Sequence, residues 1–406
     1  MVSLIVLVVS LAVTIYLVQK GHQLYWGLLA GSVFLSITKG NNLKATAQVF
    51  WQGLSSNKAI ELIAAVTIIT ILTSVLTKCN LLEGMVKSLS NFLNNPKLTI
   101  MGIPALVGGI PVTGGAIISA PLVDQLGSQL ALSNARLAAI NVIFRHVFIF
   151  VTPFRTHYIL AASLSAIPIF TMVKTLAPLT VLGLISGYWV LLRKVQANKQ
   201  DNLNLRCRLA AGFNFLLLAS PLSLIFIGII IGLRLDLALS LGLMLALLLA
   251  VGNPNLNFNT IIKGINYQLI ITIASIAVFI TVVDDLEVLP KLLNEIITYG
   301  ISLKLLVFVV PLIIGYITAD ITACIALVLP LMSPLLPLDE TRLYYVTTMY
   351  AASFIAYIIS PLHLCQVLTI DYFKINLMQI YREYWSIILI LFIGILVLFF
   401  LNIRVV

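Results

Sequence analysis

Two charged side chains stand within sequence that is apolar enough to cross a membrane, and each could do chemistry there. Arg155 is the best candidate for an anion clamp, because a guanidinium holds a carboxylate through two parallel hydrogen bonds. Asp320 is a functional candidate because ionisable residues at membrane depth are costly; it could bind a cation, carry a proton or pair with an arginine. A structural salt bridge is the alternative for Asp320. Arg145 and His146 lie further from the break, and we interpret this pair as structural or as lying near the cytoplasmic mouth.

Glycine, proline and hydroxyl residues interrupt the apolar sequence at four places beside these charges. The four breaks are Gly108–Gly115, Thr152–Pro153, Thr318–Thr322 and Ser360–Pro361. Unpaired backbone groups that face lipid cost several kcal/mol each, so broken backbone at this depth must be buried in protein or line a wet cavity. A helix N-terminus there offers N–H groups to an anion, and a C-terminus offers carbonyl oxygens to a cation. The breaks therefore predict a binding site near the middle of the membrane.

The residues at the breaks form two predicted sets. The predicted substrate-binding set is Thr113, Gly114, Gly115, Thr152, Pro153, Arg155, His157, Ser360, Pro361 and His363. The predicted set for a coupling ion is Asp320, Thr318, Thr322, Gly109 and Ser360. Hydroxyl and carbonyl oxygens are hard ligands of the kind that sodium prefers. Any single hydroxyl could instead bond back to a helix carbonyl, but the four breaks together favour a site.

The composition indicates that lipid is the solvent around this chain. Of its 406 residues, 61% are hydrophobic and only 9% are charged, whereas a soluble protein carries roughly 25% charged residues. The net charge of +10 does not indicate nucleic-acid binding, because the basic residues sit in short loops, where they set membrane orientation. The four cysteines lack CxxC spacing and the four histidines are scattered, so we predict no disulfide, metal site or cofactor. The predicted class is an all-α polytopic membrane protein.

Apolar runs predict about ten membrane-spanning helices. They cover residues 1–18, 23–39, 59–77, 136–169, 174–193, 212–233, 236–252, 267–284, 344–370 and 385–402. Two further apolar stretches, 98–126 and 305–333, are each interrupted near the middle. We predict that these two stretches are re-entrant hairpins, which enter and leave the membrane on one side.

The two halves of the chain match each other at spaced glycines and prolines. Three glycine pairs are each 211 residues apart: Gly21 with Gly232, Gly31 with Gly242, and Gly53 with Gly264. The proline pairs follow at offsets of 207 and 208: Pro104 with Pro311, and Pro153 with Pro361. Each half then holds about five full spans and one hairpin, and because five is odd the second half is inverted relative to the first.

This duplication sets the predicted domain boundaries. The first repeat is 1–193, with scaffold helices in 1–77, the hairpin at 98–126, a broken helix at 136–169 and a helix at 174–193. A linker covers 194–211, and the basic residues around it place it in the cytoplasm, with both termini outside. The second repeat is 212–406, with scaffold helices in 212–284, the hairpin at 305–333, a broken helix at 344–370 and a helix at 385–402.

Two blocks carry a resemblance to a known family: GIPALVGGIPVTGGAIISAPLVD and the later NVIFRHVFIFVTPF. They resemble an uncharacterised prokaryotic membrane family, domain of unknown function 401, which is grouped with the ion transporter superfamily beside gluconate, citrate and dicarboxylate permeases. The resemblance implies inverted repeats, two re-entrant hairpins, two broken helices, a homodimeric scaffold and an elevator-like motion in a prokaryotic plasma membrane. Sodium–dicarboxylate members carry Ser-Asn-Thr at both hairpin tips, whereas the tips here are PVTGG and TADIT. The coupling ion, sodium or a proton, therefore stays open.

The leading hypothesis is a secondary active transporter, working by symport, of a small organic anion, with a carboxylate as the expected class. Its expected partners are that solute, the lipid bilayer and a second copy of the chain. One alternative is a cation–proton antiporter that uses Asp320, with Arg155 as the counter-charge. An intramembrane enzyme is disfavoured because the sequence has no HExxH or GxSxG motif. A passive scaffold has no use for duplicated breaks, and a channel stays open as a further alternative.

Overall fold

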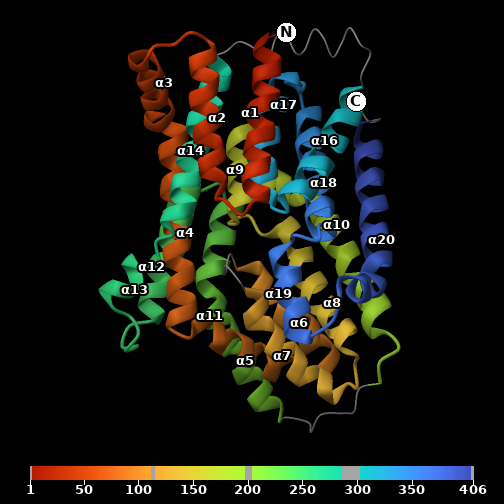
Figure 1. The fold of residues 1–406 in the computed structure, drawn as a ribbon. Coiled ribbons are helices and arrows are strands. Elements are labelled where there is room, and N and C mark those ends of the chain that lie inside the picture. Colours follow the sequence, from red (N-terminus) through yellow and green to blue (C-terminus); the bar gives the residue numbers. More distant parts are fainter. Residues whose placement is uncertain (1, 111–114, 197–203, 286–301, 404–406) are drawn as a thin grey trace.

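The computed structural model describes residues 2–110, 115–196, 204–285 and 302–403, and every regular element in these ranges is helical (Figure 1). The predicted all-α fold is therefore confirmed. By their contacts the helices fall into two groups. The scaffold group consists of α1 (Val2–Gln19), α2 (Leu24–Thr38), α3 (Leu43–Ser55), α4 (Asn57–Lys78), α5 (Leu81–Leu93), α11 (Leu205–Ile230), α12 (Leu235–Leu249), α13 (Phe258–Ile262) and α14 (Tyr267–Asp285). The site group consists of α6 (Pro96–Gly109), α7 (Gly115–Gln129), α8 (Asn134–Val147), α9 (Thr156–Ser165), α10 (Ile169–Gly187), α16 (Leu303–Thr318), α17 (Ile321–Met332), α18 (Thr341–Ile359), α19 (Leu364–Phe373) and α20 (Leu377–Ile403).

Three single turns complete the described elements. A 3-10 turn at Phe148–Val151 follows α8, a π-helical turn at Tyr188–Leu192 extends α10, and a 3-10 turn at Ser333–Leu335 follows α17. The main contacts between the two groups join α5 to α6, α4 to α9, α1 to α16 and α10 to α11. All other extensive contacts lie within one group, so the site group packs largely on itself.

Seven helical stretches in the described residues are long and apolar enough to cross a membrane: Asn57–Lys78, Asn134–Ser165, Ile169–Leu192, Leu205–Ile230, Phe258–Asp285, Thr341–Phe373 and Leu377–Phe400. Each corresponds to a predicted span, so the chain is a polytopic membrane protein. The predicted spans 1–18, 23–39 and 236–252 contain shorter apolar helices. Both α2 and α12 have 15 residues, which is about 22 Å of helix against a hydrocarbon core about 30 Å thick. The helices at 23–39 and 236–252 are therefore shorter than the sequence predicted, whereas α1, with 18 residues, has the length predicted for 1–18.

Part of the predicted linker 194–211 is helical. α11 begins at Leu205, and the side chain of Asn204 accepts the N–H of Arg206 at 3.4 Å. An asparagine at this position satisfies one of the free N–H groups at a helix start, and the leucines, arginines and alanines that follow are good helix formers. Arg206 and Arg208 therefore belong to the first turn of α11.

Two other predicted boundaries differ from the structure for local reasons. The broken helix predicted at 136–169 ends at Ser165, because Ala166 adopts a left-handed φ of 58° and Pro168 cannot continue the helix. The next helix then begins at Ile169, earlier than the predicted 174. The last helix, predicted to begin at 385, begins at Leu377, since its first turns carry polar residues that the apolar pattern does not detect.

The glycines paired by the 211-residue offset have matching roles in the two halves. Gly21 and Gly232 each follow a helix with a left-handed φ, 86° and 84° respectively, a conformation that costs glycine little. Gly53 lies against α14, where an added Cβ would be 3.0 Å from the Cα atom of Val278. Gly264 lies against α4, where an added Cβ would be 2.6 Å from the Cβ atom of Ser74. Equivalent glycines thus allow equivalent close contacts.

The helix contacts are reciprocal in the same way. α1 packs on α2 as α11 packs on α12, α2 packs on α14 as α12 packs on α4, and α7 packs on α19 as α17 packs on α9. Figure 1 shows α6 and α7 in the lower half of the view and α16 and α17 in the upper half, so the hairpins approach from opposite ends. This is the arrangement that two inverted repeats produce; the boundaries at 193 and 212 stay a prediction.

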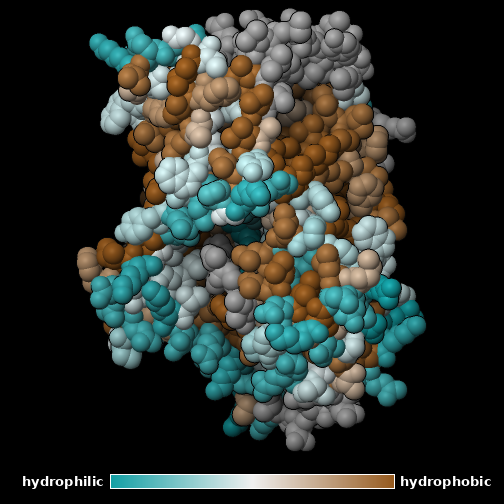
Figure 2. Space-filling model, viewed as in Figure 1, coloured by the Kyte–Doolittle hydropathy of each residue, from teal (hydrophilic) through white to brown (hydrophobic). Residues whose placement is uncertain are grey.

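The surface and the chain ends agree with a molecule that has two aqueous ends. Figure 1 places the start of α1 and the end of α20 at one end, and the start of α11 at the other. Figure 2 shows hydrophobic surface over the upper half of this face and hydrophilic surface at mid-height and at the lower end. Which end faces the cytoplasm stays a prediction from the basic residues.

Candidate functional site

The second hairpin reverses direction over two residues, Ala319 and Asp320. Ala319 has a left-handed φ of 49°, and its N–H donates to the carbonyl of Gly315 at 2.9 Å, which closes α16. Asp320 then begins α17, because its carboxylate accepts the N–H of Ala323 at 2.8 Å. A carboxylate at a helix N-terminus is stabilised by free N–H groups and by the helix dipole. Asp320 is therefore held in place as a helix cap.

The predicted ion ligands at this tip are placed differently from one another. The side chain of Asp320 is exposed in this conformation. Thr318 is buried, and its hydroxyl donates to the carbonyl of Ile314 at 2.8 Å, which is the back-bonding alternative. Thr322 is half-buried in the first turn of α17.

Tyrosine hydroxyls from α20 satisfy the carbonyl groups at the second helix break. Tyr381 donates to the carbonyl of Ile359 at 2.6 Å. The hydroxyl of Tyr384 lies 3.3 Å from the carbonyl of Ile358 and makes a shorter contact with Oε1 of Gln366. The side chain of Tyr384 is fully buried. These carbonyls end α18, where no helical N–H is in position to bond them, so the protein itself supplies their partners.

Ser360 joins this break to the second hairpin. Its hydroxyl donates to the carbonyl of Tyr316 on α16 at 2.8 Å and accepts the N–H of Leu362 at 3.3 Å. Pro361 is exposed beside it. The Ser360 hydroxyl thus uses its proton to connect α16 with the break between α18 and α19.

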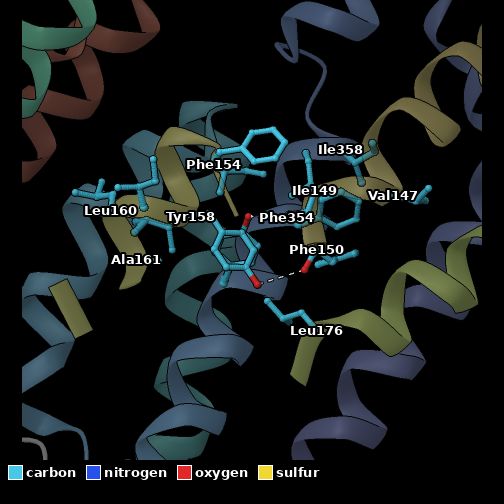
Figure 3. Close-up of a cluster of buried hydrophobic side chains, with 14 of the residues drawn as sticks. Val147, Ile149, Phe150, Phe154, Tyr158, Leu160, Ala161, Leu176, Phe354 and Ile358 are labelled. Carbon is cyan, nitrogen blue, oxygen red and sulfur yellow. Dashed lines mark hydrogen bonds between the residues drawn. The ribbon is translucent and has the colours of Figure 1, made fainter. Parts of the chain in front are cut away.

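The first helix break has the same construction. Figure 3 shows the ring of Tyr158 among buried apolar side chains, with its hydroxyl directed at the carbonyl of Phe150, to which it donates at 3.3 Å. Tyr350 donates to the carbonyl of Ile149 at 3.3 Å. Both tyrosines are fully buried. The sequence argument expected bare carbonyls at the breaks for a cation; in this conformation each of these four carbonyls has a tyrosine hydroxyl beside it and keeps a second lone pair.

Thr152 and His157, on either side of the first break, also have partners within the protein. The hydroxyl of Thr152 donates to the carbonyl of Phe148 at 2.6 Å, so it bonds back to its own helix. Nδ1 of His157 lies 2.7 Å from the hydroxyl of Tyr350. Pro153 is buried between them. These side chains therefore hold the break together in this conformation.

Two arginines meet the first hairpin tip from the broken helix. Arg155 donates from Nη1 to the carbonyl of Gly108 at 2.6 Å. The buried guanidinium of Arg145 lies against Gly115, where an added Cβ would be 2.6 Å from Nη2 and 2.9 Å from Nη1. Gly115 begins α7, whose first N–H groups also favour a negative charge. The tip is thus flanked by two guanidinium groups and a helix N-terminus.

Tyr357 lies where groups from both halves come together. Its hydroxyl is 3.3 Å from Nε2 of His146, and its ring centroid is 3.9 Å from that of His363. It is also within electrostatic range of both Arg145 and Asp320. Arg155 and His363, which align in the repeat, both occupy the residue immediately before a helix, α9 and α19 respectively. The structure therefore gathers the predicted charges around one tyrosine.

Some predicted residues cannot be placed in this cluster. Thr113 and Gly114 lie outside the described residues. Gly109 ends α6 with open space around its Cα atom. The remaining predicted residues lie at the tips and breaks described above.

Sequence reasoning missed the residues that hold the site together. Arg145 was interpreted as structural, yet its guanidinium lies at the hairpin tip. The signal available was its position in α8, the helix that leads into the first break. The pair Tyr381 and Tyr384 could have been found from their spacing of three residues, which puts both hydroxyls on one face of α20.

Three grooves separate the site group from the scaffold group. One of about 680 Å³ lies between α11 and the first break and is bordered by Gly109, Thr152 and Phe226. A second of about 780 Å³ lies between α5 and α7, and a third of about 590 Å³ lies between α12 and α9. Each groove takes lining residues from both groups. Direct packing between the groups is therefore interrupted on several sides.

The family of the chain follows from its sequence along almost its full length. The family described as a protein of unknown function, DUF401, matches residues 1–403. The chain belongs to the DUF401 family. None of the curated proteins compared with this DUF401 chain matches it.

A solved structure shows the same fold. The crystal structure of the YdaH transporter of Alcanivorax borkumensis, described as having an unusual topology, superimposes with a TM-score of 0.63. The alignment covers 89% of the DUF401 chain and 90% of the YdaH chain, at 14% sequence identity. At this identity the similarity shows that the two chains share a fold.

Proposed function

We propose that this DUF401 protein is a secondary active transporter that carries a small organic anion, with a carboxylate as the expected class, coupled to sodium or protons. The observation that carries the proposal is the convergence of Arg145 and Arg155 on the first hairpin tip. Guanidinium groups bind carboxylates through paired hydrogen bonds, and the N-terminus of α7 adds N–H donors beside them. That the shared fold includes a protein named as a transporter supports the same proposal.

The transport motion that we propose is an elevator-like displacement of the site group against the scaffold group. Both hairpins, both broken helices and all the charged groups around Tyr357 belong to the site group. The grooves along its boundary leave few direct contacts to exchange during such a displacement. A homodimer, expected from the family resemblance, would hold the scaffold group fixed in the membrane.

The proposal is tested with the full chain purified and reconstituted in proteoliposomes. A thermal-shift screen with succinate, citrate, gluconate and benzoate selects an anion, because a ligand that binds only the folded protein stabilises it. Uptake of that radiolabelled anion is then measured with and without sodium and pH gradients. Arg155→Ala is expected to weaken the apparent affinity roughly 10- to 100-fold, since hydrogen bonds to charged groups contribute about 1.5–3 kcal/mol.

Arg206→Ala is the matched control, because it removes the same charge from an exposed position near the start of α11. Uptake by this variant should equal that of the wild-type protein. Equal uptake by the Arg155→Ala variant, inserted and folded, would remove the anion clamp. If no tested anion stabilises the protein or enters the vesicles, anion transport itself is rejected.

The antiporter alternative makes Asp320 the proton carrier and Arg155 its counter-charge. In the described part of the chain these two residues form no ion pair; Arg155 bonds instead to a backbone carbonyl and Asp320 to a backbone N–H. This arrangement favours anion transport. Proton flux that continues unchanged in the absence of any organic anion would support the antiporter.

A further inference from the structure

Two histidines and a cysteine from different halves of the chain meet beside Tyr357. His146 lies in the last turn of α8, His363 precedes α19, and Cys365 is in the first turn of α19. The ligand atoms that these three side chains offer all lie within 4.8 Å of one another. The rings of His146 and His363 are 4.7 Å apart, centroid to centroid.

Hydrogen bonding fixes the tautomer of His146 and leaves the lone pair on Nε2, directed at the hydroxyl of Tyr357 beside this cluster. Its Nδ1 lies 2.6 Å from the carbonyl oxygen of Val142. A carbonyl can only accept, so Nδ1 carries the proton and Nε2 keeps its lone pair. A backbone carbonyl that fixes the tautomer in this way is the usual arrangement behind a metal-binding histidine. Nε2 is the nitrogen that faces Tyr357.

His363 is fully buried, and neither of its ring nitrogens has a hydrogen-bond partner among the described residues. Buried polar side-chain atoms almost always have a partner, which can be an ion or an ordered water. The packing of its ring against Tyr357 and His146 does not satisfy a nitrogen atom. The side chain therefore lacks a partner of the kind that a metal ion provides.

The charges around the cluster restrict the ion that it could hold. Arg145 is within electrostatic range of both His363 and Cys365, and its charge opposes any cation there unless an anionic ligand offsets it. A metal-bound thiolate at Cys365 supplies that negative charge. An N₂S set of donors suits zinc and other borderline or soft ions, and does not suit sodium or calcium.

We propose that His146, His363 and Cys365 bind one zinc-class transition-metal ion and thereby join the two broken helices. Binding forms two nitrogen–metal bonds and one sulfur–metal bond, and the thiol proton of Cys365 leaves to solvent. Three protein ligands leave a fourth tetrahedral position for another donor. The proposal does not depend on what the protein transports.

The test uses the full chain in detergent after treatment with a chelator. Cobalt(II) is the probe, because a thiolate ligand gives it a near-ultraviolet charge-transfer band that oxygen and nitrogen ligands do not give. We expect one metal ion per chain by elemental analysis, together with this band. Cys365→Ser should abolish the band, and His363→Ala should weaken binding by at least about tenfold, because even outer ligand partners have effects of 10- to 100-fold.

Matched controls come from the same residue types at exposed positions. Cys207→Ser and His22→Ala should bind cobalt like the wild-type chain, since both side chains are exposed and far from the cluster in the sequence. Circular dichroism and size exclusion show whether each variant is folded; cysteine and serine are nearly the same size, so the Cys365→Ser variant should fold. Absence of stoichiometric binding, or binding unchanged by both ligand substitutions, overturns the proposal and leaves the cluster to be paired by ordered water.

Discussion

Substitution of Gly108 by alanine examines the contact between the first hairpin tip and the broken helix. A Cβ atom there would lie 2.7 Å from the carbonyl carbon of Arg145 and closer still to its oxygen, whereas Cβ contacts under 3.0 Å are essentially not observed. Both atoms of Arg145 belong to the backbone and cannot rotate away, so α6 must shift away from α8 to make room for the added Cβ atom. Overpacking of a core costs about 1–3 kcal/mol, and an unyielding contact places this variant near the upper limit.

The magnitude can be converted into a melting temperature. Unfolding entropy is about 2.1 cal/mol/K per residue, so for 406 residues a loss of about 3 kcal/mol lowers Tm by about 3–4 °C. Displacement of the tip should also disturb the bond from Arg155 to Gly108 and reduce anion uptake. Thermal unfolding of the purified protein in detergent, followed by intrinsic fluorescence, measures the first effect.

The neighbouring glycine supplies the control. A Cβ atom at Gly109 would meet nothing within 4 Å, and alanine is favoured over glycine in a helix by up to about 1 kcal/mol. The Tm of Gly109→Ala should therefore stay within about 1 °C of the wild-type value or rise. If Gly108→Ala melts like the wild-type protein while Gly109→Ala is destabilised, the close contact described here between Gly108 of α6 and the backbone of Arg145 is refuted.

Three further substitutions test other parts of the site. Tyr384→Phe removes the hydroxyl that bonds Oε1 of Gln366 and contacts the Ile358 carbonyl, and should cost about 1–3 kcal/mol; an unchanged Tm would show that both acceptors have other partners. Ser119→Ala removes the hydroxyl that donates to Asn141 at 2.6 Å and should lower stability by a similar amount, also read from Tm. Asp320→Asn keeps a side chain that caps helices well but removes the charge, so the fold should persist; uptake with unchanged sodium and pH dependence would show that Asp320 serves only as a cap.

The fold was largely predictable because its determinants are local and periodic. Long apolar runs define most of the spans, and glycine and proline mark the tips and breaks. The offset of 211 between Gly53 and Gly264 identified two close contacts with equivalent roles. The lengths of two helices were not predicted correctly: α2 and α12, with 15 residues each, are shorter than the hydrocarbon core is thick. Apolar character alone does not show where a helix ends.

The site was less predictable because its partners are distant in the sequence. Arg155 and the prolines mark the breaks, but nothing in the sequence places Arg145 at Gly115 or Tyr350 at Ile149. Those contacts depend on how four helices pack, and the repeat pattern fixes only which helices are equivalent. The gathering of His146 and His363, which lie 217 residues apart in the sequence, has the same origin.

The tyrosines that close both helix breaks have a consequence for the transport cycle that we propose. The carbonyl groups of Phe150 and Ile359 accept hydrogen bonds from tyrosine side chains of the protein itself. Their hydrogen bonding therefore does not depend on a bound substrate. An empty carrier can then return through the bilayer with its interrupted helices intact. Net accumulation of a substrate requires this return of the empty carrier. A carrier whose broken backbone needed bound substrate as its hydrogen-bond partner could only exchange one substrate molecule for another.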